Sequence, residues 1–355
     1  MAEVLKRHNH YVPEMYLNNW AHDKRIFTYL LLTSHADVPV WNPTAVKNTA
    51  SIDNLYVRRV KGSEIDDFED VFMRRYETPA KEPLDKACSN QCLSQEDWHI
   101  LIDYVAAQVV RTPAFFFRTK DKMKEYMPSI LDSIGEELKT VTQEQLETHT
   151  PEKAKAEELI PISVNLTETM PDDEHQCVEI KTVVGKSLWL FCIEYLLSDT
   201  AKVLHKHKWS IISAAEGVKW PTSDDPVICL NYYEPGKYDF GGGWERKGTE
   251  IFFPICPTKA LYTQVGYKHP PRISFDVETS VFLKKIIAEH AFMFVYASEQ
   301  DEDIPVFHPR TVDLAEYNRV ANEFEQWYDM YTEQEVPLLD NRLVNNMQRK
   351  AEDNP

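Results

Sequence analysis

The stretch from Ser94 to Arg118 constrains the fold most, because it carries the clearest helical pattern of the chain. Ser94 followed by Asp97 predicts a capping box at its start. The apolar residues that follow cover a wide face, which is typical of a helix buried among other elements. They are Ile100, Leu101, Tyr104, Val105, Ala107, Val109 and Val110. We therefore expect a central helix, interrupted at Thr112-Pro113 because the residue before a proline disfavours the helical conformation.

Short apolar runs of strand length alternate irregularly with further helical patterns, and no βαβ repeat is evident. Strands are expected near residues 26–32, 52–57, 209–230, 251–265 and 291–297. Further helices are expected at 14–20, at 63–88 with Ser63 as the cap, and at 183–204, 281–290 and 312–331. Gly241-Gly242-Gly243 is expected to form a flexible hairpin loop. The sequence thus predicts an α+β fold in which a mixed or mainly antiparallel sheet packs against long helices.

Composition divides the chain into four expected parts. Residues 136–180 are rich in Glu, Thr, Lys and Pro, and we expect an exposed helical insertion or linker there. It would separate an N-terminal helical part, 1–135, from a sheet-rich part, 181–335, that completes the same domain. A polar tail, 336–355, follows.

Charge and cysteine usage exclude some classes of protein. A formal net charge of −18 disfavours a protein that coats nucleic acid, since that role needs a broad basic surface, but it leaves room for a local basic pocket. The six cysteines form no CxxC pair, so we expect reduced thiols in a cytoplasmic protein. The chain offers no run of about 18 apolar residues, and no membrane association is expected.

The segment Arg7-His8-Asn9-His10-Tyr11-Val12-Pro13 is the first candidate site. In an extended backbone, His8 and His10 project from the same face, because side chains alternate with a period of two. Two imidazoles in this arrangement suit a divalent metal ion or an anion. The alternative is that both histidines are surface or hydrogen-bonded structural residues.

Other polar residues stand beside apolar patterns. Arg111, three residues after Gln108 at the end of the central helix, must pair with a carboxylate or hold a substrate anion, because an isolated buried charge is costly. Asp224, after Ser223 in a polar turn between strands, would be a metal ligand, a base or an ordinary turn former. Glu69 flanks an apolar helical stripe and is the carboxylate to test as inward-facing. Further polar candidates are Lys47 and Asn54 as donors, and His205 and His207 at a helix end.

Four motifs, taken in order, resemble an uncharacterised and mainly bacterial family, domain of unknown function family 4238. They are His8-Asn9-His10-Tyr11-Val12-Pro13 with Tyr16-Leu17 and Trp20, Gln108-Val109-Val110-Arg111-Thr112-Pro113, Thr222-Ser223-Asp224-Asp225-Pro226-Val227 and Phe253-Pro254-Ile255-Cys256-Pro257. The resemblance spans about residues 8–297 and implies that the motifs belong to one site, without implying an activity. The family pattern often has Asn at the position of Asp225, so this residue departs from it.

From these observations we expect a cytoplasmic hydrolase or nuclease-like enzyme that acts on a phosphate-containing substrate, a nucleotide or nucleic acid. His8 and His10 would act as metal ligands or general acid and base, Asp224 as ligand or base, Arg111 as phosphate clamp and Glu69 as a further catalytic carboxylate. A divalent metal ion is the expected cofactor. Substrate contacts are expected from Lys47, Asn54, Gln108, Arg111 and Ser223.

Two alternatives remain open. The first is a metal-independent transferase or lyase that uses the histidines for proton transfer. The second is a non-enzymatic ligand-sensing or protein-interaction module, in which the same residues form a buried polar network that fixes the fold. The oligomeric state does not follow from the sequence.

Overall fold

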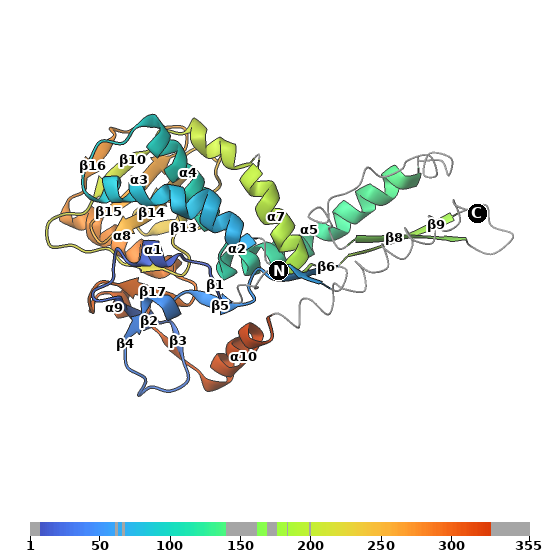
Figure 1. Cartoon of the computed structure of the whole chain (residues 1–355), viewed down its shortest axis with the longest axis horizontal. Helices are drawn as coiled ribbons and strands as arrows, with labels where there is room; N and C mark the ends of the chain where they lie inside the picture. Colours follow the sequence, from blue (N-terminus) through green and yellow to red (C-terminus); the bar gives the residue numbers. More distant parts are fainter. Residues whose placement is uncertain are drawn as a thin grey trace, which may run out of the picture.

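The computed structural model describes residues 8–60, 63–65, 68–139, 162–168, 176–182, 184–198 and 200–327. These residues form helices and mostly antiparallel sheets, which confirms the expected α+β class (Figure 1). Residues 140–161 and 169–175 of the expected insertion, and the expected tail, lie outside the described part of the chain.

A six-stranded sheet forms the centre of the body. Its neighbouring strands are antiparallel except for one parallel pair at the edge, β10 with β16. In sheet order the strands are β13 (Lys237–Asp239), β12 (Ile228–Glu234), β14 (Glu250–Cys256), β15 (Lys259–Gln264), β10 (Ser210–Ser213) and β16 (Arg272–Ser274).

Helices cover both faces of this sheet, because its strands alternate apolar side chains between two clusters. Phe253 of β14 packs into the cluster that contains Leu101 of α4 (Gln95–Val110), and Phe252 packs into the cluster that contains Ile286 of α8 (Val277–His290). α3 (Thr78–Cys88) lies beside α4 and against β14. The long central helix predicted from the sequence therefore packs on one face of the main sheet.

A second sheet ties the two ends of the chain together. It is antiparallel and places strands from the first 45 residues beside strands from beyond residue 220. Its order is β11 (Thr222–Ser223), β17 (Phe294–Ala297), β2 (Arg25–Leu30) and β4 (Trp41–Ala45). Beside it, β3 (Leu32–Thr33) pairs in parallel with β18 (Thr311–Val312), and α9 (Ile304–Phe307) and α10 (Leu314–Glu325) complete this end.

The capping box predicted for α4 is present. The Ser94 hydroxyl accepts a hydrogen bond from the Asp97 backbone N–H at 3.1 Å, and the Asp97 carboxylate accepts one from the Ser94 N–H at 2.8 Å. α4 ends before Thr112, and α5 (Pro113–Lys139) leaves at an angle of 62°. A proline at the first position of α5 fits this break, since a helix start needs no N–H there.

The prediction that Ser63 caps a helix was wrong. Ser63 lies in β7 (Ser63–Ile65), which forms a hairpin with β6 (Arg58–Val60). The helical segment begins at Phe68 with α2 (Phe68–Val71) and passes through a π-helical turn, η2 (Phe72–Glu77), into α3. Pairing of Ser63–Ile65 with β6 decides the conformation here, whereas the sequence period predicts a helix.

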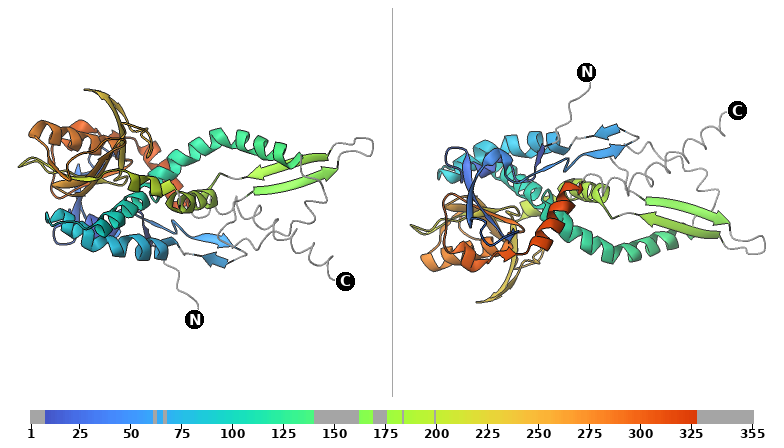
Figure 2. Two further views of the ribbon diagram at one scale, coloured as in Figure 1. Left: turned by 90° about the horizontal axis from the view of Figure 1, so that it is seen from above. Right: turned by 90° about the horizontal axis from the view of Figure 1, so that it is seen from below.

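The segment expected to be a helical insertion contains a β-hairpin. Strands β8 (Ile162–Glu168) and β9 (Gln176–Thr182) pair along their whole length. Figures 1 and 2 show α5 and this hairpin extending from the same side of the body. After the hairpin, α7 (Lys186–Ser198) and the 3-10 segment η4 (Thr200–Lys206) return the chain to the body.

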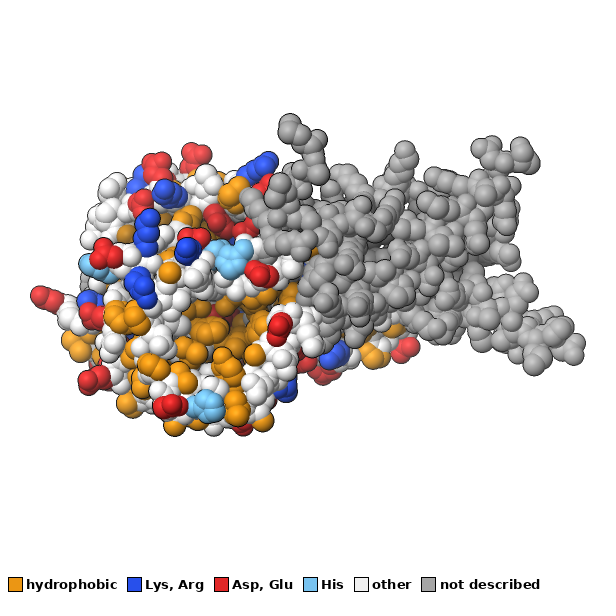
Figure 3. Space-filling view, turned by 60° about the horizontal axis from the view of Figure 1, so that its bottom comes forward, with side chains coloured by type: hydrophobic (Ala, Val, Ile, Leu, Met, Phe, Trp, Pro, Cys, Tyr) orange, Lys and Arg blue, Asp and Glu red, His pale blue; other side chains and the backbone are white. Residues whose placement is uncertain are grey.

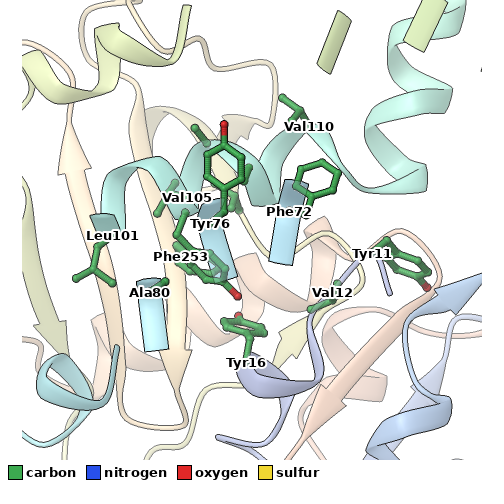
Figure 4. Packing of buried hydrophobic residues seen from close by; sticks show 14 of the residues in the cluster. Tyr11, Val12, Tyr16, Phe72, Tyr76, Ala80, Leu101, Val105, Val110 and Phe253 are labelled. Atoms are coloured by element: carbon green, nitrogen blue, oxygen red, sulfur yellow. The ribbon is translucent and has the colours of Figure 1, made fainter. Parts of the chain in front are cut away.

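The opening motif is anchored by aromatic packing. Tyr16 of α1 (Glu14–Leu17) stacks on Phe253 with ring centroids 5.0 Å apart (Figure 4). The indole of Trp20 donates a hydrogen bond to the Trp220 carbonyl at 2.8 Å. The expected core positions Tyr16, Leu17 and Trp20 are all buried.

The surface of the body is mixed in charge. Figure 3 shows one face, on which acidic and basic side chains are interspersed around a central apolar area. Within the described ranges, no single helix combines the length and apolar composition needed to cross a membrane, and only the bent pair α4 and α5 passes that test together.

Candidate functional site

The paired histidines lie at the edge of the body. His8 and His10 form β1 (His8–His10) and pair with β5 (Ser51–Asp53), and their ring centroids are 5.2 Å apart. Both Nε2 atoms face the backbone carbonyl of Lys47, at 3.3 and 3.2 Å. The Asp53 carboxylate, 2.9 Å from Nδ1 of His8, raises the pKa of His8, whereas burial lowers the pKa of His10. Two neighbouring imidazoles thus differ in proton affinity.

The expected third metal ligand does not join them. In the described part of the chain, no group of three or more His, Cys, Asp or Glu side chains has the arrangement of a metal centre. The Asp224 carboxylate instead binds backbone: its two oxygens accept hydrogen bonds from the N–H groups of Phe292 and Met293, at 2.9 and 2.7 Å. Asp224 therefore fixes the segment that leads into β17.

Asp224 still contacts the opening motif through two tyrosines. Tyr11 and Tyr296 hydrogen bond through their hydroxyls; burial raises the pKa of both, and the nearby Asp224 charge raises it further. Burial raises the pKa of Asp224 itself to about 7. The sequence motifs around Tyr11 and Asp224 are thus neighbours in the fold, as the family resemblance implies.

Arg111 is completely buried and fully engaged by the protein. Its guanidinium donates to the Glu77 carboxylate at 2.6 Å and to the backbone carbonyl of His10. Tyr56 donates its hydroxyl to the Arg111 carbonyl at 2.9 Å, and the guanidinium lies 4.4 Å from the ring centroid of Phe72. We call Arg111, Glu77, Tyr56, Phe72 and the His10 carbonyl the arginine network.

The charge balance of this network explains how a buried cation is tolerated. Burial alone would lower the pKa of Arg111, but Tyr56, Glu77 and Glu69 together raise it above its usual range. The Glu69 carboxylate of α2 thus has a buried oxygen and interacts electrostatically with the buried Arg111, in agreement with the inward orientation that its place beside the apolar stripe suggests. Glu77 was not among the residues predicted from the sequence. The sequence did indicate that a buried Arg111 needs a carboxylate partner, but it did not identify which one.

Asp225, adjacent to Asp224, faces a different region. Its carboxylate pairs with Arg118 of α5 and accepts a hydrogen bond from the Thr112 hydroxyl at 3.4 Å. Its backbone carbonyl lies 3.0 Å from Nδ1 of His290, and its N–H donates to the Ser223 hydroxyl at 3.2 Å. The residue that departs from the family pattern thus fixes a basic side chain, and Ser223 supports the turn.

A cavity of about 660 Å³ opens beside Asp225, between α5, η4, β12 and the end of α8. We call it the basic cavity, because four of its lining residues are cations and one is an acid, Glu245. The cations are Arg118, Lys122, Lys202 and Lys206. Aromatic residues form other parts of the wall: Phe115, Phe240 and Trp244. His290 also lines the cavity. Burial lowers the pKa of its imidazole and so favours the neutral form.

The glycine segment Gly241–Gly243 forms a fixed wall of the basic cavity, which corrects the expected flexible hairpin loop. Its three N–H groups donate to Asp239, the Cys229 carbonyl and Thr249, at 2.8, 3.1 and 3.3 Å. A Cβ at Gly242 would lie 2.7 Å from the Cys229 carbonyl oxygen, so a side chain cannot be accommodated. These amides are committed to the protein and do not form a phosphate loop.

The remaining predicted substrate contacts are scattered. The Gln108 side chain is completely buried, and its amide has no hydrogen-bond partner among the described residues. Lys47 has an exposed side chain and contributes its carbonyl to the histidines. Asn54 adopts a left-handed backbone conformation, with φ of 58°, and its carbonyl accepts a hydrogen bond from the buried Lys186 at 2.6 Å. These three residues hold no common position around the basic cavity.

The second histidine pair is structural in its contacts. His205 lies 2.7 Å from the Asp103 carboxylate, and His207 lies 2.6 Å from the Trp244 carbonyl. The four cations of the cavity were not predicted from the sequence. The one sequence feature that pointed to them is that basic residues recur four positions apart in each of two helical segments, Arg118 with Lys122 and Lys202 with Lys206.

Comparison with known proteins gives a family and no named relative. No curated protein and no solved structure matches the chain. One family model covers most of the described body, including all four motifs and the residues of the basic cavity. With a match over residues 8–303, the chain belongs to the family described as "Protein of unknown function (DUF4238)".

Proposed function

We propose that the protein binds a phosphate-containing small molecule in the basic cavity. The supporting observation is a local excess of positive charge in a chain of formal net charge −18. Four cations and one acid, Glu245, line the cavity, and Asp225 pairs with one of these cations, Arg118. A concave site lined by one sign of charge concentrates ligands of the opposite sign.

The aromatic part of the wall defines the ligand further. Phe115, Phe240 and Trp244 offer ring surfaces beside the cations. A ligand that carries both a phosphate and a planar or apolar group would contact the cations with the first and the aromatic rings with the second. A cavity of about 660 Å³ has the volume of a typical small-molecule site. Nucleotides meet this description.

Arg118 is the cation best placed to orient a phosphate. Its guanidinium is held through Nη1 by the buried Asp225, while about half of the side chain is exposed. A guanidinium fixed on one side presents its remaining donors in a defined direction, which favours bidentate contact with phosphate oxygens. The Asp225 carboxylate would therefore act as a positioning group.

Calorimetric titration with AMP, ATP and pyrophosphate at low ionic strength tests this proposal. The double variant Lys122→Glu with Lys206→Glu should weaken binding at least tenfold, equal to about 1.4 kcal/mol, because it places two negative charges at the cavity. Lys81→Glu with Lys219→Glu makes the same change in net charge away from the cavity lining and should leave affinity unchanged. Added salt should weaken wild-type binding.

Two results would overturn the proposal. One is the absence of measurable binding for every phosphate compound. The other is an equal loss of affinity in the cavity variant and in the charge-matched control, since that would indicate attraction by the whole surface.

The paired histidines favour a second candidate function, a metal-dependent phosphate-ester hydrolase. Ligands bound about 2.1 Å from one tetrahedral ion lie about 3.4 Å apart. The two Nε2 atoms lie 3.3 and 3.2 Å from the Lys47 carbonyl oxygen, which resembles that spacing and is long for a hydrogen bond. His8, His10 and this carbonyl would hold a divalent ion, whose chemistry would be to activate water.

Phosphate release from nucleotides, measured with and without Mn²⁺ or Zn²⁺, tests the second candidate. Hydrolysis that needs the ion and disappears in His10→Ala would support it. If nucleotides bind at the basic cavity without any release of phosphate under these conditions, hydrolase activity is rejected while the binding proposal stands.

A further inference from the structure

Two cysteines that are far apart in sequence meet where α3 ends against β14. Cys88 is the last residue of α3, and Cys256 is the last residue of β14. The single S–H of Cys88 is shared between the Cys256 sulfur and the carbonyl oxygen of Ile255, the residue before Cys256, which lies 3.5 Å from the Cys88 sulfur. Both residues are free thiols and both are partly accessible. This contact belongs to neither the basic cavity nor the arginine network.

The surroundings of Cys256 favour a thiolate. The Cys88 thiol donates to its sulfur, and Thr258 adds a backbone N–H and a hydroxyl at 3.7 Å. The positive charge of Lys259 acts in the same direction. Against the opposing effect of burial, these groups lower the pKa of Cys256 to about 6. A thiolate is the reactive form of cysteine, so Cys256 is prepared to act as a nucleophile at neutral pH.

We propose that Cys256 and Cys88 are an oxidisable thiol pair that closes to a disulfide on reaction with a hydroperoxide. The Cys256 thiolate attacks the terminal peroxide oxygen, the O–O bond breaks, and the departing oxygen is protonated to water or alcohol. Cys256 becomes a sulfenic acid. The Cys88 sulfur then attacks Cys256, the S–O bond breaks, and water leaves with the Cys88 proton. Two thiols are oxidised by two electrons, and the peroxide is reduced.

The pair is distinguished from Cys192 and Cys229 by the interaction between its two thiols and by the pKa of Cys256. Burial raises the pKa of Cys229 to about 12 and that of Cys192 to about 11, so both are held as thiols. Cys92 is exposed. An accessible thiolate with a second thiol in contact is the usual arrangement of redox-sensitive cysteines. The sequence motif Phe253-Pro254-Ile255-Cys256-Pro257 thus acquires a chemical role at its cysteine.

The disulfide would form beside the opening helix. The Ile255 carbonyl that accepts from Cys88 also accepts from the Asn19 side chain at 2.8 Å, and the neighbouring Pro254 carbonyl accepts from the Tyr16 hydroxyl at 2.7 Å. A covalent link between α3 and β14 closes a loop that spans nearly half the chain. Such a link restricts the unfolded chain, so oxidation should raise the denaturant midpoint.

The test uses the full-length reduced protein, treated with hydrogen peroxide and then alkylated, with peptides identified by mass spectrometry. We expect loss of two alkylation sites and a disulfide-linked pair of peptides that contain Cys88 and Cys256. Dithiothreitol should restore both sites. Cys92→Ser is the control variant and should give the same linked peptides.

Two further variants separate the steps. Cys88→Ser should leave a sulfenic acid on Cys256 that reacts with dimedone, and Cys256→Ser should leave Cys88 alkylated after peroxide. The proposal is overturned if peroxide-treated wild-type protein keeps both thiols free, or if Cys92 or another cysteine replaces either partner in the linked peptides. Neither result depends on ligand binding at the basic cavity.

Discussion

Replacement of Arg111 by Met would show whether this arginine holds the fold or a ligand. Met fills similar space over Phe72, but it cannot donate to Glu77, the His10 carbonyl or the Tyr56 hydroxyl. Removing one partner of a buried ion pair costs about 3 to 5 kcal/mol, because the other charge stays behind unpaired. The Glu77 side chain is 17% exposed, so partial hydration places the expected loss near 3 kcal/mol.

Urea unfolding of four proteins would measure this loss in the free energy of unfolding. They are the wild type, Arg111→Met, Glu77→Gln and the double variant. Since the double variant removes both charges of this ion pair, it should recover about 1 to 3 kcal/mol relative to the sum of the single changes. A loss below about 1 kcal/mol in Arg111→Met, or simple additivity, would refute a structural ion pair. Loss of nucleotide binding without loss of stability would instead support the phosphate clamp expected from the sequence.

Three other changes test the packing and the buried carboxylate. Trp20→Ala should lower the free energy of unfolding by about 3 to 5 kcal/mol in urea, because it opens a cavity and removes the bond to the Trp220 carbonyl. Tyr16→Phe should lower it by about 1 to 3 kcal/mol, since the Thr222 hydroxyl and Pro254 carbonyl lose their partner. The folded-state pKa of Asp224, about 7, exceeds the unfolded value, so its contribution to stability should decrease as pH rises from 4 through 7. Urea unfolding at pH 5 and 8 should show a smaller decrease in Asp224→Asn than in the wild type.

Local patterns predicted local structure well. The capping box at Ser94 and Asp97, the extended His8-x-His10 segment and the buried face of the first helix each depend on neighbours within a few residues. Ser63 shows the limit of such reasoning. Its residue type suits a helix cap, but pairing of its strand with β6 decided the local conformation.

Contacts between distant residues were not predictable in the same way. Arg118 and Asp225 are 107 residues apart, and the strands of the second sheet come from both ends of the chain. The sequence indicated that Arg111 needs a carboxylate, but only the fold identifies Glu77 as its partner. The basic cavity likewise arises because α5, η4 and the glycine segment converge, and none of them alone has the appearance of a site.

The motifs of the family lie close together in the fold, and their polar groups form a buried network, which is one of the alternatives that the sequence left open. The opening motif meets Arg111 through the His10 carbonyl and meets Asp224 through Tyr11 and Tyr296. Most of these polar groups are satisfied within the protein, which favours the alternative of a buried network that fixes the fold. The Asp224-Asp225 turn connects to the basic cavity through Asp225, which accepts from the Thr112 hydroxyl and pairs with Arg118, a lining residue of that cavity.

A crystal structure of the protein with bound AMP or pyrophosphate would show directly where the phosphate binds. We expect phosphate density within hydrogen-bond distance of Arg118, with Lys122 or Lys206 beside it, and an undisturbed contact between Arg111 and Glu77. Phosphate bound instead at Arg111 or between His8 and His10, with the basic cavity empty of ligand, would contradict this expectation.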